Sequence, residues 1–207
     1  MRFLQNVLSS PRFFRAFKNA VGGMERYCSE FIRTRPGDRV LDIGCGTGDI
    51  IEWLGDVEYI GFDLSPEYIQ KAQRDYGSRG TFFCEAVRDD VAVQHGAFDV
   101  VLANGILHHL DDDEARSLLL LATKALTPKG RFVTMDGCYT QTQSRIKKLI
   151  LDADRGRFVR TEPEYLALAR TAFTDIRATV LDDLIRIPYT HLIMECSAPV
   201  GPGAVKA

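Results

Sequence analysis

The segment from Val40 to Ile50, VLDIGCGTGDI, limits the possible folds more than any other part of this chain. It begins as a short apolar run, continues through the alternating glycines Gly44, Gly46 and Gly48, and then reads as the start of a helix near Asp49. Glycine adopts positive φ without strain and lets a ligand approach the bare main chain. The segment therefore predicts a strand, a tight turn and a helix, with a ligand against the turn.

Strand and helix patterns alternate along most of the remaining sequence, which is typical of a parallel sheet covered on both faces. Further strands are predicted at 59–64, 81–84, 98–103 and 131–135, helices at 25–34, 66–76, 114–126 and 162–173, and a final antiparallel pair at 176–181 and 190–196. The expected fold class is α/β. It is a single Rossmann-like, doubly wound domain with a mostly parallel seven-stranded sheet and one antiparallel edge strand.

A chain of 207 residues without an internal repeat is expected to form one domain. The N-terminal residues are basic and aromatic, which fits an amphipathic helix folded over the domain and leaves a transit or membrane-surface helix as the alternative. The expected parts are a helical lid at 1–36, a cofactor-binding core at 38–135, an acceptor-side segment at 137–196 and a loose tail at 197–207.

Charge and cysteine content exclude several classes of protein. A net charge of −2 gives no general attraction for nucleic acid, and no apolar run approaches the roughly 18 residues of a membrane span. The five cysteines are scattered and form no C-x-x-C pair, so neither a disulfide framework nor a zinc cluster is predicted. We expect a cytoplasmic protein that binds neither nucleic acid nor a structural metal.

The spacing of the glycines bears on the kind of ligand. The pattern is G-x-G-x-G, whereas the dinucleotide fingerprint is G-x-G-x-x-G, and Asp49 here places a carboxylate where a pyrophosphate needs the helix end. Asp63 ends the second strand, where such sheets place an acid that accepts hydrogen bonds from ribose hydroxyls. The two features favour an adenosine-type ligand without phosphates, although Asp63 as a helix cap before Ser65 stays open.

Four segments together resemble the class I S-adenosylmethionine-dependent methyltransferases, in particular the small-molecule branch that includes quinone-biosynthesis enzymes. They are Val40 to Gly48, Gly61 to Ser65, Phe98 to Leu110 and Leu126 to Phe132. The resemblance implies S-adenosylmethionine as the cofactor and methyl transfer to a small molecule. A nicotinamide-dependent oxidoreductase, a non-catalytic cofactor-binding module and a protein methyltransferase remain as alternatives.

The resemblance also implies which residues hold the methionine and ribose parts of the cofactor. Gly44 and Gly46 would contact them through the backbone, Cys45 and Gly48 would complete the loop, and Asp42 would orient it. Asp63 would hold the ribose hydroxyls, and Leu64 would lie against the adenine. The cofactor-binding residues predicted in this part of the chain are Asp42, Gly44, Cys45, Gly46, Gly48, Asp63 and Leu64.

The remaining assignments concern the adenine and the methyl acceptor. Val87 stands where relatives usually carry an acid for the adenine amino group. The backbone of Ala86 and Val87 is expected to serve instead, with the side chain of Glu85 or Asp89 as the alternative. Asn104, just after the fourth strand, would border the cofactor and the acceptor. His108 is the candidate general base, with a packed histidine as the alternative. The basic residues of 137–160 favour an anionic acceptor, with a solvated helix face as the alternative.

Overall fold

A computed structural model describes residues 22–153 and 156–200 of the chain. The path of the sheet is β3-β2-β1-β4-β5-β8-β7, and β6 pairs with the end of β5. The strands are β1 Arg39–Ile43, β2 Glu58–Phe62, β3 Gly80–Phe83, β4 Phe98–Asn104, β5 Leu126–Tyr139, β6 Arg160–Thr161, β7 Phe173–Leu181 and β8 His191–Pro199. The strands from β3 to β5 are parallel, and β8 runs antiparallel to both β5 and β7. The predicted α/β class and the antiparallel pair at one edge are confirmed.

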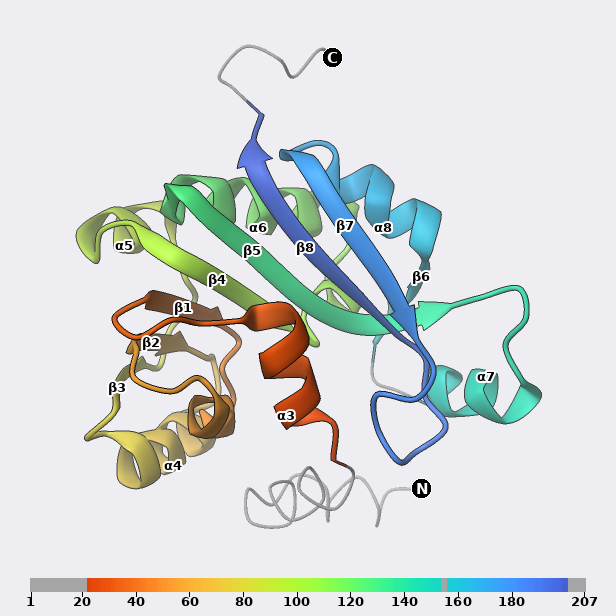
Figure 1. Cartoon of the computed structure of the whole chain (residues 1–207), viewed down its shortest axis with the longest axis horizontal. Helices are drawn as coiled ribbons and strands as arrows, with labels where there is room; N and C mark the ends of the chain where they lie inside the picture. The colour runs from red at the N-terminus through yellow and green to blue at the C-terminus, as the bar shows by residue number, and fades with distance from the viewer. Residues whose placement is uncertain (1–21, 154–155, 201–207) are drawn as a thin grey trace.

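Helices cover both faces of this sheet. They are α3 Met24–Tyr27, the π-turn η1 Cys28–Ile32, the 3-10 turn η2 Asp49–Trp53, α4 Pro66–Tyr76, α5 Asp89–Gln94, the 3-10 turn η3 Leu107–His109, α6 Asp112–Ala125, α7 Arg145–Asp152 and α8 Glu162–Ala169. In Figure 1, α3 lies in front of the sheet, whereas α6 and α8 lie behind it. On the front face no described helix lies over β7 and β8.

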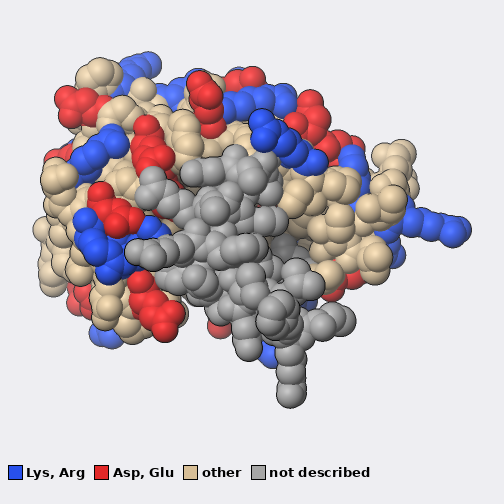
Figure 2. Space-filling view, turned by 90° about the horizontal axis from the view of Figure 1, so that it is seen from below, with Lys and Arg blue, Asp and Glu red and all other residues tan. Residues whose placement is uncertain are grey.

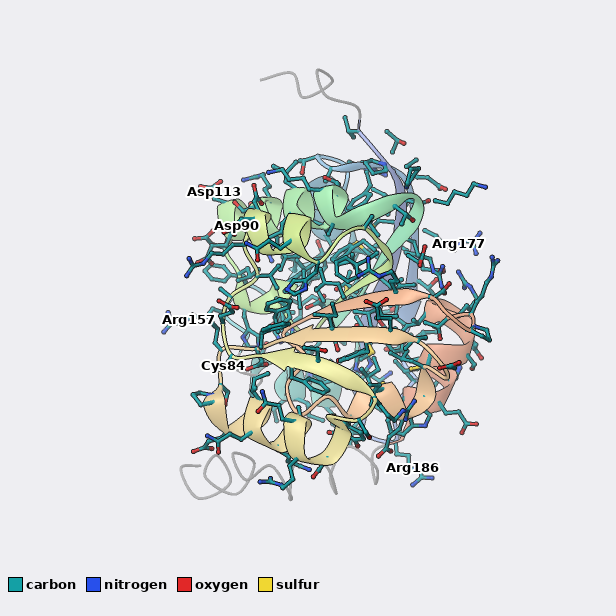
Figure 3. All side chains as sticks on the ribbon, turned by 90° about the vertical axis from the view of Figure 1, so that its left-hand side faces the viewer. Cys84, Asp90, Asp113, Arg157, Arg177 and Arg186 are labelled. Atoms are coloured by element: carbon teal, nitrogen blue, oxygen red, sulfur yellow. The ribbon has the colours of Figure 1, made fainter. Side chains whose placement is uncertain are left out.

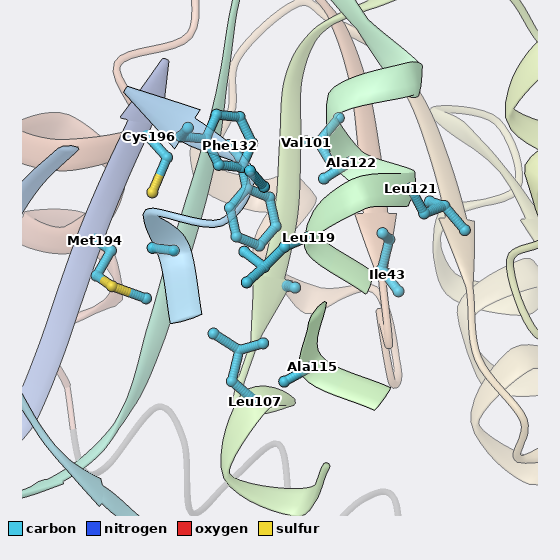
Figure 4. Close-up of a cluster of buried hydrophobic side chains, with 14 of the residues drawn as sticks. Ile43, Val101, Leu107, Ala115, Leu119, Leu121, Ala122, Phe132, Met194 and Cys196 are labelled. Carbon is cyan, nitrogen blue, oxygen red and sulfur yellow. The ribbon is translucent and has the colours of Figure 1, made fainter. Parts of the chain in front are cut away.

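The core is divided by the sheet into two layers of apolar side chains. Behind the sheet, Phe132 of β5 stacks on Phe173 of β7 with ring centroids 5.9 Å apart, and Leu119 and Ala122 of α6 complete this layer (Figure 4). In the front layer, Tyr27 and its neighbours on α3 and η1 pack against the strand residues that alternate with those of the rear layer. This alternation is the period of two that a strand buried on both faces requires.

Several predicted boundaries were wrong, and each error has a physical reason. The helix expected after the glycine turn is a short 3-10 helix of five residues, because Gly55, at φ 75°, follows its C-cap Leu54 directly. β5 continues to Tyr139 rather than stopping at Met135, because β8 and β6 both pair with its last residues. Helices α5 and α7 were not predicted, since each is too short to show a clear period.

The described part of the N-terminal segment packs tightly on the sheet. Tyr27 and Ile32 are fully buried there. The predictions for residues 1–21 and 201–207 lie outside the described residues. Within the described ranges, no helix is long and apolar enough to cross a membrane. The face seen from below carries Lys and Arg interspersed with Asp and Glu (Figure 2).

Candidate functional site

The glycine turn after β1 is tied to the end of β2. The amides of Gly44 and Cys45 both donate to the carbonyl of Phe62, at 2.8 and 2.9 Å. Gly44 has φ 74°, and a Cβ there would lie 2.2 Å from the Ile106 side chain. Gly48 has φ 70°, and a Cβ there would lie 2.7 Å from the ring of Phe82. These two glycines are required by the packing of the protein itself.

Gly46 differs from both, because its Cβ position is open. With φ 57°, a Cβ built there would meet no atom of the described chain within 4 Å. The neighbouring Cys45 turns its side chain into the core, where its Sγ would contact any Cβ at Gly61. The turn therefore leaves main chain at Gly46 bare beside open space, which is the geometry that a ligand pressed against backbone requires.

Asp63 bridges this turn and the start of α4. One carboxylate oxygen accepts from the amide of Gly46 at 2.9 Å, and the other accepts from the amide of Ser65 at 2.8 Å. The cap of α4 is Ser65, whose side chain accepts from the amide of Tyr68, so Asp63 does not cap this helix. The bond to Gly46 places the acid directly on the glycine turn. A carboxylate has about four acceptor positions, so two stay available for hydroxyl donors.

The expected adenine side of the site is formed by the residues after β2 and β3. Leu64 is 73% exposed, which is unusual for a leucine and leaves a flat apolar surface at this edge. The Cys84 side chain lies next to it, with Sγ 3.9 Å from the Leu64 carbonyl oxygen. Ala86 is exposed, whereas Val87 is half-buried and packs against the rear core layer. Only the backbone of Val87 is therefore suited to a polar contact with a ligand.

Two buried tyrosines hold polar residues of the site. Tyr59 donates its hydroxyl to Asp42 at 2.6 Å, and Tyr27 donates to the Asn104 side-chain oxygen at 2.5 Å. Burial raises the pKa of both hydroxyls well above the ordinary tyrosine value, so both stay protonated donors. The second bond fastens α3 to the end of β4. Sequence reasoning missed the role of Tyr27 because its partner lies 77 residues away.

His108 and Asp136 form a buried pair behind the ends of β4 and β5. The imidazole Nδ1 lies 2.9 Å from Asp136 Oδ1, and the backbone amide of His108 donates to the same oxygen at 3.2 Å. Because a carboxylate only accepts, Nδ1 carries the proton that His108 shares with Asp136. The Cε1 edge of the ring lies close to Gly105, next to Asn104. The sequence signal for Asp136 was an acid in an otherwise apolar strand.

The segment after α7 covers this histidine. The ring of His108 lies against Gly156, where a Cβ would come within 2.3 Å of Cδ2, and the amide of Phe158 donates to the His108 carbonyl at 2.9 Å. Arg160 fixes the arrangement, because its guanidinium binds the carbonyls of Leu107, Leu110 and Phe158 and the carboxylate of Asp112. The acceptor-side segment is thus fastened to the loop that carries His108.

The positive residues expected to attract an anionic acceptor do not act as one group. Arg160 is buried and its charge is neutralised by Asp112 at 2.8 Å, and Lys147 pairs with Asp182 at 2.9 Å. Arg145, Lys148 and Arg157 are exposed, and Arg155 lies outside the described residues. The acids after His109 begin α6, where Asp111 forms a capping box. In the described part of the chain, no three potential ligands cluster as a metal site.

A sheet of this strand order, with a glycine turn after β1 held by an acid after β2, defines the class of Rossmann-like cofactor-binding domains. Residues 40–130 match a family model described as a methyltransferase domain. In this region, from β1 into β5, the chain is similar to methyltransferases.

Individual relatives are distant and often larger. The chain is 27% identical over 121 residues to an uncharacterized methyltransferase of Synechocystis, covering 56% of each protein. It is 31% identical over 110 residues to a ubiquinone biosynthesis O-methyltransferase of Xanthomonas euvesicatoria, covering 49% of this chain and 45% of that protein. The chain thus spans about half the length of these curated relatives.

The fold likeness extends over almost the whole chain. A TehB-like SAM-dependent methyltransferase from Corynebacterium glutamicum superposes with a TM-score of 0.63 at 19% identity, covering 90% of this chain and 93% of that one. At this identity the likeness establishes the shared fold.

Proposed function

We propose that this protein transfers a methyl group from S-adenosylmethionine to a hydroxyl group of a small molecule, and that His108 removes the hydroxyl proton. The observation that carries the proposal is the His108–Asp136 pair, because Ile106, two residues before His108, lies against Gly44 of the glycine turn. A sulfonium donor is already activated, so an amine acceptor needs no base, whereas a hydroxyl gains from proton removal. A buried, oriented imidazole is therefore most useful to a hydroxyl acceptor.

The chain supplies cofactor binding through main chain and one carboxylate. In this proposal Gly44, Cys45, Gly46 and Gly48 form the cradle, and the open space at Gly46 receives the ligand. Asp63 accepts from the ribose hydroxyls with the positions that its bonds to Gly46 and Ser65 leave. The cofactor supplies an electrophilic methyl group when bound.

The other predicted contacts agree with this orientation of the cofactor. Leu64 offers its exposed surface to the adenine, and the backbone of Ala86 and Val87 meets the edge of the base. Asp42 and Asn104, both held by buried tyrosines, face the methionine part of the ligand.

Methyl transfer follows from the placement of the acceptor. The acceptor oxygen would attack the methyl group that the bound cofactor supplies, and S-adenosylhomocysteine would leave. Nε2 of His108 would take the hydroxyl proton of the acceptor in the same step. Asp136 keeps the imidazole in the required tautomer and stabilises the imidazolium. The segment around Gly156 shields the pair from water.

The chemical class of the acceptor is proposed from the charge of the protein surface. Exposed Arg145, Lys148 and Arg157 favour an anionic small molecule, and a net charge of −2 disfavours nucleic acid. None of the five cysteines forms a disulfide, which supports a reducing, cytoplasmic location.

Calorimetric titration with S-adenosylhomocysteine tests the binding half of the proposal. The Asp63→Asn variant is expected to bind about tenfold more weakly or worse, because it loses a charged acceptor. Asp56→Asn, at an exposed aspartate away from the turn, is the matched control. Equal affinities in both variants would contradict the role of Asp63.

Incubation with methyl-labelled S-adenosylmethionine and a metabolite extract tests the reaction. The expected product is an O-methylated compound that the His108→Gln variant fails to form while it still binds S-adenosylhomocysteine. Binding without any product would favour the non-catalytic module, and a labelled protein band would favour a protein acceptor.

A further inference from the structure

A pocket of about 270 Å³ lies on the sheet away from the candidate site, where the turn after η1 meets the start of β7 and the end of β8. Its charged lining is Arg33, Lys129, Arg131, Asp175, Arg177 and Glu195. Figure 3 places Arg177 on the opposite side of the molecule from Cys84 and Arg157. Because Cys84 follows β3 at the carboxyl edge of the sheet, this pocket belongs to the other edge.

The lining has more positive than negative charge. Four cations against two carboxylates leave a net charge of +2. Glu195 is neutralised by an ion pair with Arg33, and Asp175 accepts from the hydroxyl of Ser197 at 3.0 Å. Lys129 and Arg177 make no ion pair or hydrogen bond to side chains within the described ranges, so their charge faces the pocket uncompensated.

Arg131 has an unsatisfied donor at this position. Its Nη2 donates to the carbonyls of Ile32 and Arg33 at the end of η1, which explains why the residue is held in place. Its Nε is buried and has no hydrogen-bond partner among the described residues. Burial and the nearby charge of Arg33 lower the pKa of the Arg131 guanidinium. A buried donor without a partner is unfavourable, so the Arg131 guanidinium in the pocket wall has hydrogen-bonding capacity that the described residues do not satisfy.

The role of Arg131 as a cap for η1 explains one of the four cations. It does not explain Lys129 and Arg177, which come from different strands and converge on the same space. Guanidinium groups bind planar or tetrahedral oxyanions through two parallel hydrogen bonds, and a lysine adds a mobile point charge. The volume lies at the small end of ligand pockets, which excludes a large ligand.

We propose that this pocket binds the phosphate group of a small soluble metabolite, with Arg131 and Arg177 as the hydrogen-bond donors and Lys129 as a further charge. The site is separate from the proposed cofactor loop and does not depend on the proposed function. It is a second ligand site on the front face of the sheet, where no described helix covers β7 and β8.

Nuclear magnetic resonance of the arginine Nε–Hε groups tests the proposal. Inorganic phosphate is titrated into the ¹⁵N-labelled full chain, with sodium chloride added so that ionic strength stays constant. The Arg131 resonance, assigned with the Arg131→Lys variant, is expected to move along a saturating curve. The double variant Lys129→Gln/Arg177→Gln is expected to weaken the apparent affinity at least about tenfold, since two charged contacts are lost.

Arg74→Gln/Arg170→Gln is the matched control, since it removes two exposed cations elsewhere and should leave the affinity unchanged. A urea unfolding curve for each variant verifies that it is folded. A shift that rises linearly without saturation, that chloride alone reproduces, or that both double variants retain equally would overturn the proposal.

Discussion

Replacing Gly46 with alanine separates what the glycine turn does for the fold from what it does for a ligand. The substitution keeps the amide that donates to Asp63, and its Cβ meets no atom of the described chain within 4 Å. Its effect on stability is therefore limited to the positive φ of 57°, which is expected to cost about 1 kcal/mol.

Gly37 is a matched control for this substitution. It has φ 85°, and a Cβ there also meets nothing within 4 Å of the described chain, but it lies in the turn before β1. Gly37→Ala should lower the free energy of unfolding by a similar amount. Only at Gly46 should the added methyl group occupy space that the cofactor needs, which is an overpacking penalty of about 1–3 kcal/mol.

Calorimetry with S-adenosylhomocysteine and urea unfolding measure the two effects on the same samples. We expect Gly46→Ala to bind about 5- to 150-fold more weakly than the native protein, and Gly37→Ala to bind within about twofold of it. If Gly46→Ala binds as well as Gly37→Ala, the open space beside the turn does not hold the cofactor, and the argument from bare main chain is refuted.

Three further predictions follow from the site. Asp136→Asn should lower kcat by about 10²- to 10⁴-fold with little change in KM, because the imidazole loses its tautomer; an unchanged kcat in steady-state assays would remove His108 as the base. Iodoacetamide at pH 8 should alkylate Cys84 first, because burial raises the pKa of Cys138 to about 12. Mass spectrometry should show that S-adenosylhomocysteine slows this reaction, and a rate independent of the ligand would count against adenine binding beside Cys84. Arg160→Met should lower the free energy of unfolding by about 3–5 kcal/mol in urea, since it leaves buried acceptors unpaired, and a loss below about 1 kcal/mol would contradict its role as a fastener.

The parts of the fold that local conformational preferences determine could be predicted from the sequence. The strand, glycine turn and acid from Asp42 to Asp63 follow from φ preferences and a period of two, and the structure brings Gly46 and Asp63 into direct contact. The ends of the strands were harder to predict, because pairing between strands determines them. β5 extends past Met135 through its bonds to β8 and β6, which no local pattern encodes.

Residues of the site that depend on distant partners were not predicted. Asp136 lies 28 residues from His108, and Tyr27 lies 77 residues from Asn104. Arg160 was expected to offer free positive charge, but it is buried and neutralised at Asp112. A basic residue in a loop looks the same in the sequence whether it faces solvent or fastens a neighbouring segment. The assigned cofactor contacts stay predictions.

The bond from Tyr27 to Asn104 joins α3 to the carboxyl end of β4. In the proposed site, exchanging α3 between related proteins would therefore move Asn104 and change how the methionine part of the ligand is held, even with every residue of the glycine turn retained.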